Sequence, residues 1–232
     1  MNMSKYLPFY SNGEAGVPAL ARDPACVFYL PLWKKDGPAF KSDDMYGQPC
    51  ANLGPVWMPQ GFSFDGMDDY VNCGSHAVLN FTQAITVGAW FKNTRLAGTW
   101  QRIVNKCYNS TAVSGCCFHL GLSNTNNRYR WSVGGAFDRT SSVVCPLDSW
   151  VFHVGAWDLA VARQYENARL IDISAAAGVV LTSAYPLTIG NAYTTTAAYP
   201  FLGIIGEVFV FNRALSQSEI SSLYTATRGR YL

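Results

Sequence analysis

Short segments of alternating apolar and polar residues, separated by turn residues, recur along most of this chain of 232 residues. The clearest example covers residues 61–91, where an aromatic segment at 62–64 runs into an Asp-Gly turn at 65–66. Glycine favours such a turn because it adopts positive φ without steric cost. In the segment 84–91, one face carries Ile85, Val87, Ala89 and Phe91. This period of two predicts strands, and many short strands predict an all-β sandwich of two antiparallel sheets.

The same reasoning predicts the other strands and one short C-terminal helix. We expect strands at 26–33, 101–106, 116–122, 128–133, 141–145, 149–157 and 187–189. In 128–133 the alternation predicts a dry face with Tyr129, Trp131 and Val133 and a wet face with Arg128, Arg130 and Ser132. A helix should run from 217 to about 225, since Ser216 and Glu219 form a capping box. Residues 36–60 are broken by Pro and Gly and predict an irregular excursion, which Trp57 and Met58 fold back over the sandwich.

Composition excludes several classes of function. Charged residues make up only 14% of the chain, the net charge is +2, and the longest run of like charge is Lys34-Lys35, so we expect no nucleic-acid partner. No apolar stretch reaches the ~20 residues that span a bilayer. The first residues show neither the apolar core nor the cleavage site of a secretory signal peptide. We therefore expect a protein of a virion surface, or one that is extracellular after lysis.

Three stretches carry a family resemblance. The run SFDGMDDYV at 63–71, followed by ITVGAWF at 85–91, resembles the opening of laminin-G-like domains in the concanavalin A-like jelly-roll group. Residues 203–220 resemble the closing strand and helix of the same family, and 149–158 its central strand with Trp. The resemblance implies one jelly-roll domain over 25–226, preceded by an extended arm at 1–24 and followed by a basic tail at 227–232.

The arm has no helical or strand period but carries apolar side chains that are costly to leave in water. These are Tyr6, Leu7, Phe9, Tyr10 and Leu20. We expect them to lie on a surface, either of their own domain or of a neighbouring subunit in an assembly.

Residues suited to catalysis are scarce. Members of the resembled group that hydrolyse polysaccharides use closely spaced carboxylates on one strand, but the four glutamates here include no E-x-D-x-x-E pattern. The histidines are dispersed, and no Ser stands in a G-x-S-x-G elbow. Seven cysteines without a C-x-x-C pair predict reduced, buried thiols, and Cys117 with His119 on one strand face is too small a set for a metal site. We expect no enzymatic activity and no certain cofactor.

Calcium is the one metal that the resemblance suggests, because several members of the family bind it at the rim of the sandwich. The candidate ligands are Asp65, Asp68, Asp69 and Glu207. Gly206 stands where the family often has Asp, which weakens the case. The alternative is that these Asp residues form turns by accepting hydrogen bonds from their own backbone.

Aromatic and amide residues in loops are the candidates for ligand binding. They are Trp100, Tyr108, Asn109, Asn191, Tyr193 and Tyr199. Sugars stack on aromatic rings and bond to neighbouring amides, while the same aromatics serve equally well as anchors in protein interfaces. The first hypothesis is therefore a non-catalytic structural or decoration protein of a virus (phage) particle, forming a homo-oligomer. The alternative is a carbohydrate-binding adhesion module.

Overall fold

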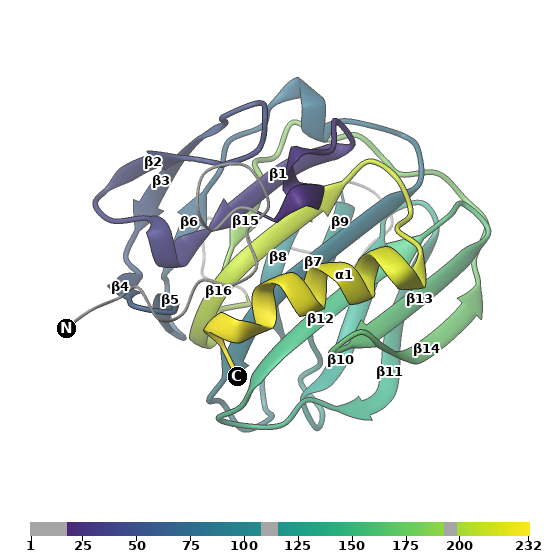
Figure 1. Ribbon diagram of the computed structural model, residues 1–232. Coiled ribbons are helices and arrows are strands. Elements are labelled where there is room, and N and C mark those ends of the chain that lie inside the picture. The colour runs from purple at the N-terminus through teal and green to yellow at the C-terminus, as the bar shows by residue number, and fades with distance from the viewer. Residues whose placement is uncertain (1–17, 108–115, 193–198) are drawn as a thin grey trace.

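The computed structural model describes residues 18–107, 116–192 and 199–232, which form two antiparallel sheets stacked face to face (Figure 1). Sheet A has the order β14 (Arg169–Ala175), β13 (Val161–Glu166), β12 (Trp150–Trp157), β7 (Ile85–Asn93), β16 (Leu202–Phe211), β5 (Gly61–Asp65) and β4 (Val56–Met58), and β1 (Cys26–Pro31) also pairs with β16. Sheet B has the order β11 (Phe137–Val144), β10 (Arg128–Val133), β9 (Cys116–Leu122), β8 (Gln101–Cys107), β15 (Thr188–Ile189), β6 (Tyr70–Asn72), β3 (Pro49–Leu53) and β2 (Ala39–Lys41). The predicted all-β jelly-roll sandwich is confirmed.

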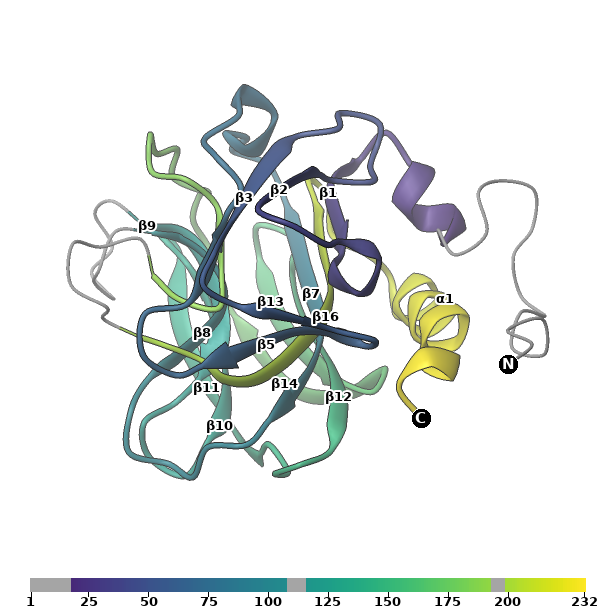
Figure 2. The same cartoon turned by 90° about the vertical axis from the view of Figure 1, so that its left-hand side faces the viewer.

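The alternation in β7 divides its side chains between two apolar clusters. Val87 and Phe91 lie in the cluster between the sheets, together with Leu120 and Trp131 of sheet B. Trp90 points the other way, into a cluster on the outer face of sheet A. Figure 2 shows α1 (Gln217–Thr227) on the opposite side of β7 and β16 from β8 and β9. The central strands β12, β7 and β16 of sheet A are therefore buried on both faces.

Helix α1 begins at the predicted capping box and packs on Trp90. The Ser216 side chain accepts from the Glu219 backbone N–H, and the Glu219 carboxylate accepts from the Ser216 N–H. Trp90 stacks on Tyr224 and Tyr231 with ring centroids 5.6 and 4.6 Å apart. Each such aromatic pair contributes roughly 0.5–1.5 kcal/mol beyond its buried area. Helix α1 ends at Thr227, two residues later than expected, because the Thr227 hydroxyl accepts from the Trp90 indole N–H at 2.7 Å.

Four short 3₁₀ helices complete the described chain, and two of them place segments expected to be arm or tail. They are η2 (Ala19–Arg22), η3 (Leu32–Lys34), η4 (Ala77–Leu79) and η5 (Arg228–Arg230). Leu20 packs partly against the outer cluster of sheet A, and Tyr231, just after η5, is buried in it. The tail at 227–232 therefore lies on its own domain. None of the described helices has the length and apolar composition needed to cross a bilayer.

Three local predictions were wrong. Residues 36–60 contain β2, β3 and β4 rather than an irregular excursion, because β3 pairs with β6 and β4 with β5. Trp57 and Met58 do not cover the sandwich, since they are 41% and 40% exposed. The wet face expected on β10 is dry: Arg130 and Ser132 are buried.

Candidate ligand-binding face

The strand register of sheet B gathers polar residues on its outer face. Gly121 of β9 lies between Arg102 of β8 and Arg130 of β10. In the next row, His119 lies between Asn105 and Ser132. Residues directly opposite each other on neighbouring strands share a face, whereas Leu120 and Trp131 point into the core. The polar face is defined here as Arg102, Asn105, His119, Gly121, Arg130 and Ser132.

Aromatic side chains cover the two arginines of the polar face. The Arg130 guanidinium lies 4.1 Å from the ring centroid of Trp100, which directly precedes β8. The Arg102 guanidinium lies 4.7 Å from the ring centroid of Tyr199. Both aromatic residues are half-buried, while Arg102 and Arg130 are only 1% and 3% exposed. The structure thus brings two of the predicted binding residues, Trp100 and Tyr199, to one surface.

The two arginines differ in their partners. Arg130 Nε donates to Asp138 Oδ1 at 2.8 Å, and its Nη2 pairs with Asp138 Oδ2. Among the described residues no carboxylate forms an ion pair with Arg102. Burial, and secondarily the charge of Arg130, lower the pKa of Arg102 to about 9. Burial likewise lowers the pKa of His119 well below its usual range, with both arginines adding to the effect, so this imidazole is neutral.

Buried hydrogen-bonding atoms on the polar face lack partners among the described residues. They are Arg102 Nε and Nη1, Arg130 Nη1, His119 Nε2 and Asn105 Oδ1. Buried polar atoms in native proteins are nearly always hydrogen-bonded, and exceptions commonly mark a place for water, an ion or a ligand. The polar face therefore has unused donors and acceptors for a polar ligand.

The other predicted binding residues do not lie on the polar face as described. Asn191 is buried, and its Oδ1 accepts from the backbone N–H groups of Ala192 and Tyr199 at 2.8 and 3.1 Å. Its amide oxygen thus joins the backbone of Ala192 to that of Tyr199 and is not open to a sugar. Tyr108, Asn109 and Tyr193 lie outside the described residues, as do Tyr6, Leu7, Phe9 and Tyr10 of the arm.

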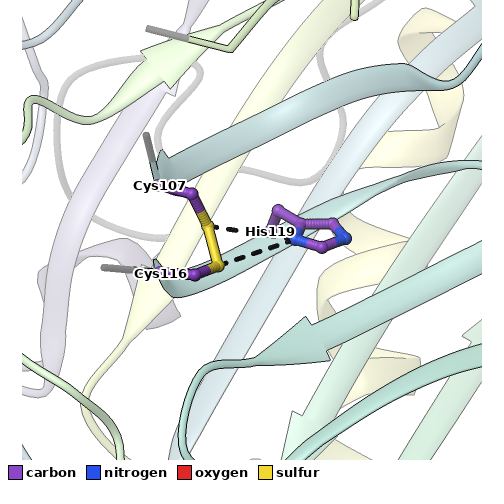
Figure 3. A group of neighbouring side chains, drawn as sticks. All are labelled: Cys107, Cys116 and His119. Carbon is purple, nitrogen blue, oxygen red and sulfur yellow. Dashed lines mark hydrogen bonds between the residues drawn. A yellow bond between two sulfur atoms is a disulfide. The ribbon is translucent and has the colours of Figure 1, made fainter. Parts of the chain in front are cut away.

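A disulfide lies beside the polar face, which corrects the expectation of reduced thiols for two of the seven cysteines; the other five are free and buried, as predicted. Cys107 and Cys116 are bonded, and His119 Nδ1 lies 3.9 and 3.8 Å from their sulfur atoms (Figure 3). Cys117, expected to share a face with His119, belongs instead to the core cluster between the sheets. With both thiols reduced, Cys107, Cys116 and His119 would form a soft ligand set of the kind that binds zinc. In the bonded form, the sulfur atoms are not thiolate ligands.

The predicted calcium ligands separate into two places. Ligand atoms of Asp65, Asp68 and Asp69 lie within 4.8 Å of one another at the turn after β5. Their oxygens also serve the turn itself, since Asp69 Oδ2 accepts from the Asp65 N–H and Asp65 Oδ1 from the Met67 N–H. Glu207 was wrongly placed in this set, because it is fully buried and bound to Arg230.

Glu207 instead joins β16 to β1, η3 and the C-terminus. It accepts hydrogen bonds from the Tyr29 hydroxyl at 3.1 Å and the Trp33 indole at 3.0 Å, and from the Tyr231 hydroxyl at 3.1 Å. Burial raises its pKa, although Arg230 and these donors oppose the rise. The preceding Gly206 has a packing reason: a Cβ there would meet the Tyr231 ring at 2.5 Å.

Comparison with known proteins identifies the family. A family model described as the concanavalin A-like lectin/glucanases superfamily matches residues 65–221, more than half of the chain. The chain belongs to this superfamily. A search of curated proteins finds no match.

Solved structures share the fold at low sequence identity. Domain 4 of AbnA, a GH43 extracellular arabinanase from Geobacillus stearothermophilus in complex with arabinotriose, is 14% identical with a TM-score of 0.65, covering 86% of this chain and 98% of that one. A mutant Trypanosoma rangeli sialidase displaying trans-sialidase activity is 15% identical with a TM-score of 0.70, covering 90% of this chain and 34% of that one. The binding domain of Paraclostridial Mosquitocidal Protein 1 is 15% identical with a TM-score of 0.65, covering 86% and 51%. At these identities the likeness shows the fold alone.

Proposed function

We propose that this chain is a non-catalytic carbohydrate-binding module that holds its ligand on the polar face of sheet B. The observation that carries the proposal is a set of buried polar atoms without partners among the described residues, on a face whose two arginines lie against the half-buried rings of Trp100 and Tyr199. Sugar recognition combines stacking on aromatic rings with a few directed hydrogen bonds. The fold that this chain shares with a domain solved in complex with arabinotriose supports the same reading.

The carboxylates support binding rather than hydrolysis. Glycoside hydrolysis needs two carboxyl groups about 5–9.5 Å apart on either side of the scissile bond. On the described part of the polar face, the neighbouring carboxylate is Asp138, and Arg130 already holds both of its oxygens. A second, paired carboxylate is not found there among the described residues.

A glycan array with the full chain tests the proposal. We expect retention of one glycan class, and we expect Trp100→Ala to weaken it by about tenfold or more, as loss of a central aromatic contact does. The matched control is Tyr46→Ala, since Tyr46 is a 44% exposed aromatic that belongs neither to the polar face nor to β4. An array without any hit, or equal loss in both variants, would contradict the proposal.

A second candidate function, attachment within a virus particle, is favoured by a different surface. Strand β4 ends sheet A, and its side chains Val56, Trp57 and Met58 are all exposed. An exposed apolar edge strand offers unpaired backbone groups to another chain. The occupant we propose is a second copy of this chain, whose segment 1–24 carries the apolar residues noted above. This candidate places the protein on a virion surface or outside the cell after lysis.

Light scattering across a range of concentrations distinguishes this candidate. We expect a homo-oligomer that Trp57→Lys or deletion of residues 1–17 dissociates. A monomer at every concentration would remove the assembly candidate and leave the carbohydrate proposal unaffected.

A further inference from the structure

We propose that the polar face binds an anionic sugar, one whose carboxylate or sulfate group lies against the guanidinium groups of Arg102 and Arg130. This inference rests on the proposed carbohydrate-binding function and names the class of its ligand. It follows from the charge of the polar face, the position of its unpartnered donors and the residues available to neutralise them.

The charge of the polar face is not balanced by the described residues of the chain. Arg102 and Arg130 contribute two positive charges, Asp138 contributes one negative charge, and burial keeps His119 neutral, which leaves one positive charge. An unpaired buried charge is costly, so buried arginines nearly always have an anionic partner. The chain segments 108–115 and 193–198, which follow β8 and precede Tyr199, contain no Asp or Glu in their sequence. The missing anion therefore does not come from these loops.

The arrangement of the two arginines suits one small anion between them. They lie on either side of β9, and strands in a sheet are about 4.8 Å apart, so their backbones are roughly 10 Å apart. Gly121 stands between them and contributes no side chain. A Cβ at Gly121 would meet the Gln101 carbonyl oxygen at 2.1 Å, so the close approach of the β8 backbone excludes any side chain at this position. Two guanidinium groups can thus approach a shared ligand from opposite sides.

The donors left unused are charged ones. Asp138 accepts from Nε and Nη2 of Arg130, which leaves Nη1 of Arg130 unused. Nε and Nη1 of Arg102 have no partner in the part of the chain that the structure describes. Hydrogen bonds from guanidinium to an oxyanion are roughly twice as strong as bonds between neutral groups. A neutral sugar would leave the excess charge uncompensated, whereas a carboxylate or a sulfate ester would neutralise it. The rings of Trp100 and Tyr199 supply the surface on which a sugar stacks.

Titration calorimetry with the full chain tests the inference. The ligands are an oligogalacturonate, the same oligosaccharide as its neutral methyl ester, and a sulfated galactan oligosaccharide. We expect at least one anionic ligand to bind about tenfold or more tightly than the methyl ester, because a charge-assisted hydrogen bond exceeds a neutral one by roughly that factor. Comparison of the carboxylate with the sulfate identifies which anion the polar face accepts. Affinity should also fall as salt is raised.

The variant Arg102→Gln should abolish the preference for the anionic ligand. The matched control is Arg169→Gln on β14, which removes the same charge from a side chain that is 66% exposed. Equal binding of the anionic ligands and the methyl ester by the wild-type chain would overturn the inference, and that comparison does not depend on how the variant folds. Trp100-dependent binding of neutral glycans alone would overturn the inference and leave the proposed function standing. Absence of any glycan binding would overturn both.

Discussion

Glu207 gives the sharpest prediction about stability, because a single carboxylate ties four separate parts of the chain together. It is 0% exposed and pairs with Arg230, whose side chain is 15% exposed. Three further donors, Tyr29, Trp33 and Tyr231, point at the same two oxygens. Removing the carboxylate therefore leaves a positive charge and three polar groups facing an apolar gap.

The expected loss can be estimated from these contacts. Breaking a buried ion pair by removing one partner lowers the free energy of unfolding by about 3–5 kcal/mol. Glu207→Ala should therefore lower the free energy of unfolding by at least that much. Glu207→Gln breaks the same ion pair but keeps one amide oxygen as a hydrogen-bond acceptor, so its loss of unfolding free energy should be smaller than that of Glu207→Ala. For a domain of this size, 1 kcal/mol corresponds to about 2–4 °C in Tm. Glu207→Ala should thus lower Tm by roughly 6–20 °C.

Urea unfolding followed by tryptophan fluorescence, with thermal unfolding in parallel, measures both losses. The control is Arg169→Ala, which breaks the exposed pair with Glu166 and should change stability by about 1 kcal/mol or less. If the free energy of unfolding of Glu207→Ala lay within about 1 kcal/mol of the wild-type value, the contacts of Glu207 would not stabilise the fold as argued. An equal loss in Glu207→Gln and Glu207→Ala would show that charge, not hydrogen bonding, carries the effect.

Three further predictions follow from local contacts. Ser216→Ala should cost ~1 kcal/mol in urea unfolding because the capping box is lost, whereas Ser222→Ala, inside the exposed face of α1, should not. Cys107→Ser, or reduction of the wild type, should cost about 2–3 kcal/mol, since the disulfide closes a loop with a sequence separation of 9; equal stability with and without dithiothreitol would contradict this. Burial lowers the pKa of His153 to about 3, so the unfolded state binds the extra proton between pH 6.5 and 3 and stability falls as pH is lowered through that window. His153→Gln should reduce the slope by up to about 1.4 kcal/mol per pH unit, and an unchanged slope would be evidence against a neutral buried imidazole.

Strands and the helix start could be predicted where they depend on residues close together in the sequence. Alternation in 84–91 and 116–122 reflects burial of one face or both, and the capping box at Ser216 is read from residues three apart. The hairpin of β13 and β14 turns at Asn167 and Ala168, so it lacks the glycine of an Asn-Gly turn. Asn167 and Ala168 nevertheless both have positive φ, 50° and 64°, so the two-residue turn persists with an alanine in a conformation that usually requires glycine.

The polar face could not be predicted because its burial depends on distant segments. In sequence, Arg128, Arg130 and Ser132 alternate with apolar residues in the way a solvated strand face does. What buries Arg130 is Trp100, thirty positions earlier, and what covers Arg102 is Tyr199. The sequence does contain one indication of these contacts, the aromatic residue at each of the two loop positions. Its stacking partner in the structure is an arginine, which the sequence analysis does not predict. Glu207 was misplaced for the same reason, since its partners Tyr29 and Arg230 are remote in sequence.

The two outer faces of the sandwich suggest why the proposed ligand would bind to sheet B. The outer face of sheet A is apolar and lies under α1 and Tyr231, so its exposure would cost hydrophobic stabilisation. The polar face of sheet B is also buried, and its guanidinium atoms that lack partners among the described residues reduce stability unless something binds them. The Arg102 donors without partners among the described residues do not stabilise the unbound fold. Proteins depart from the rule that buried polar groups are hydrogen-bonded chiefly at functional sites. Arg102→Gln should then leave the Tm of the unbound chain equal or higher, whereas a purely structural role for Arg102 requires a lower one.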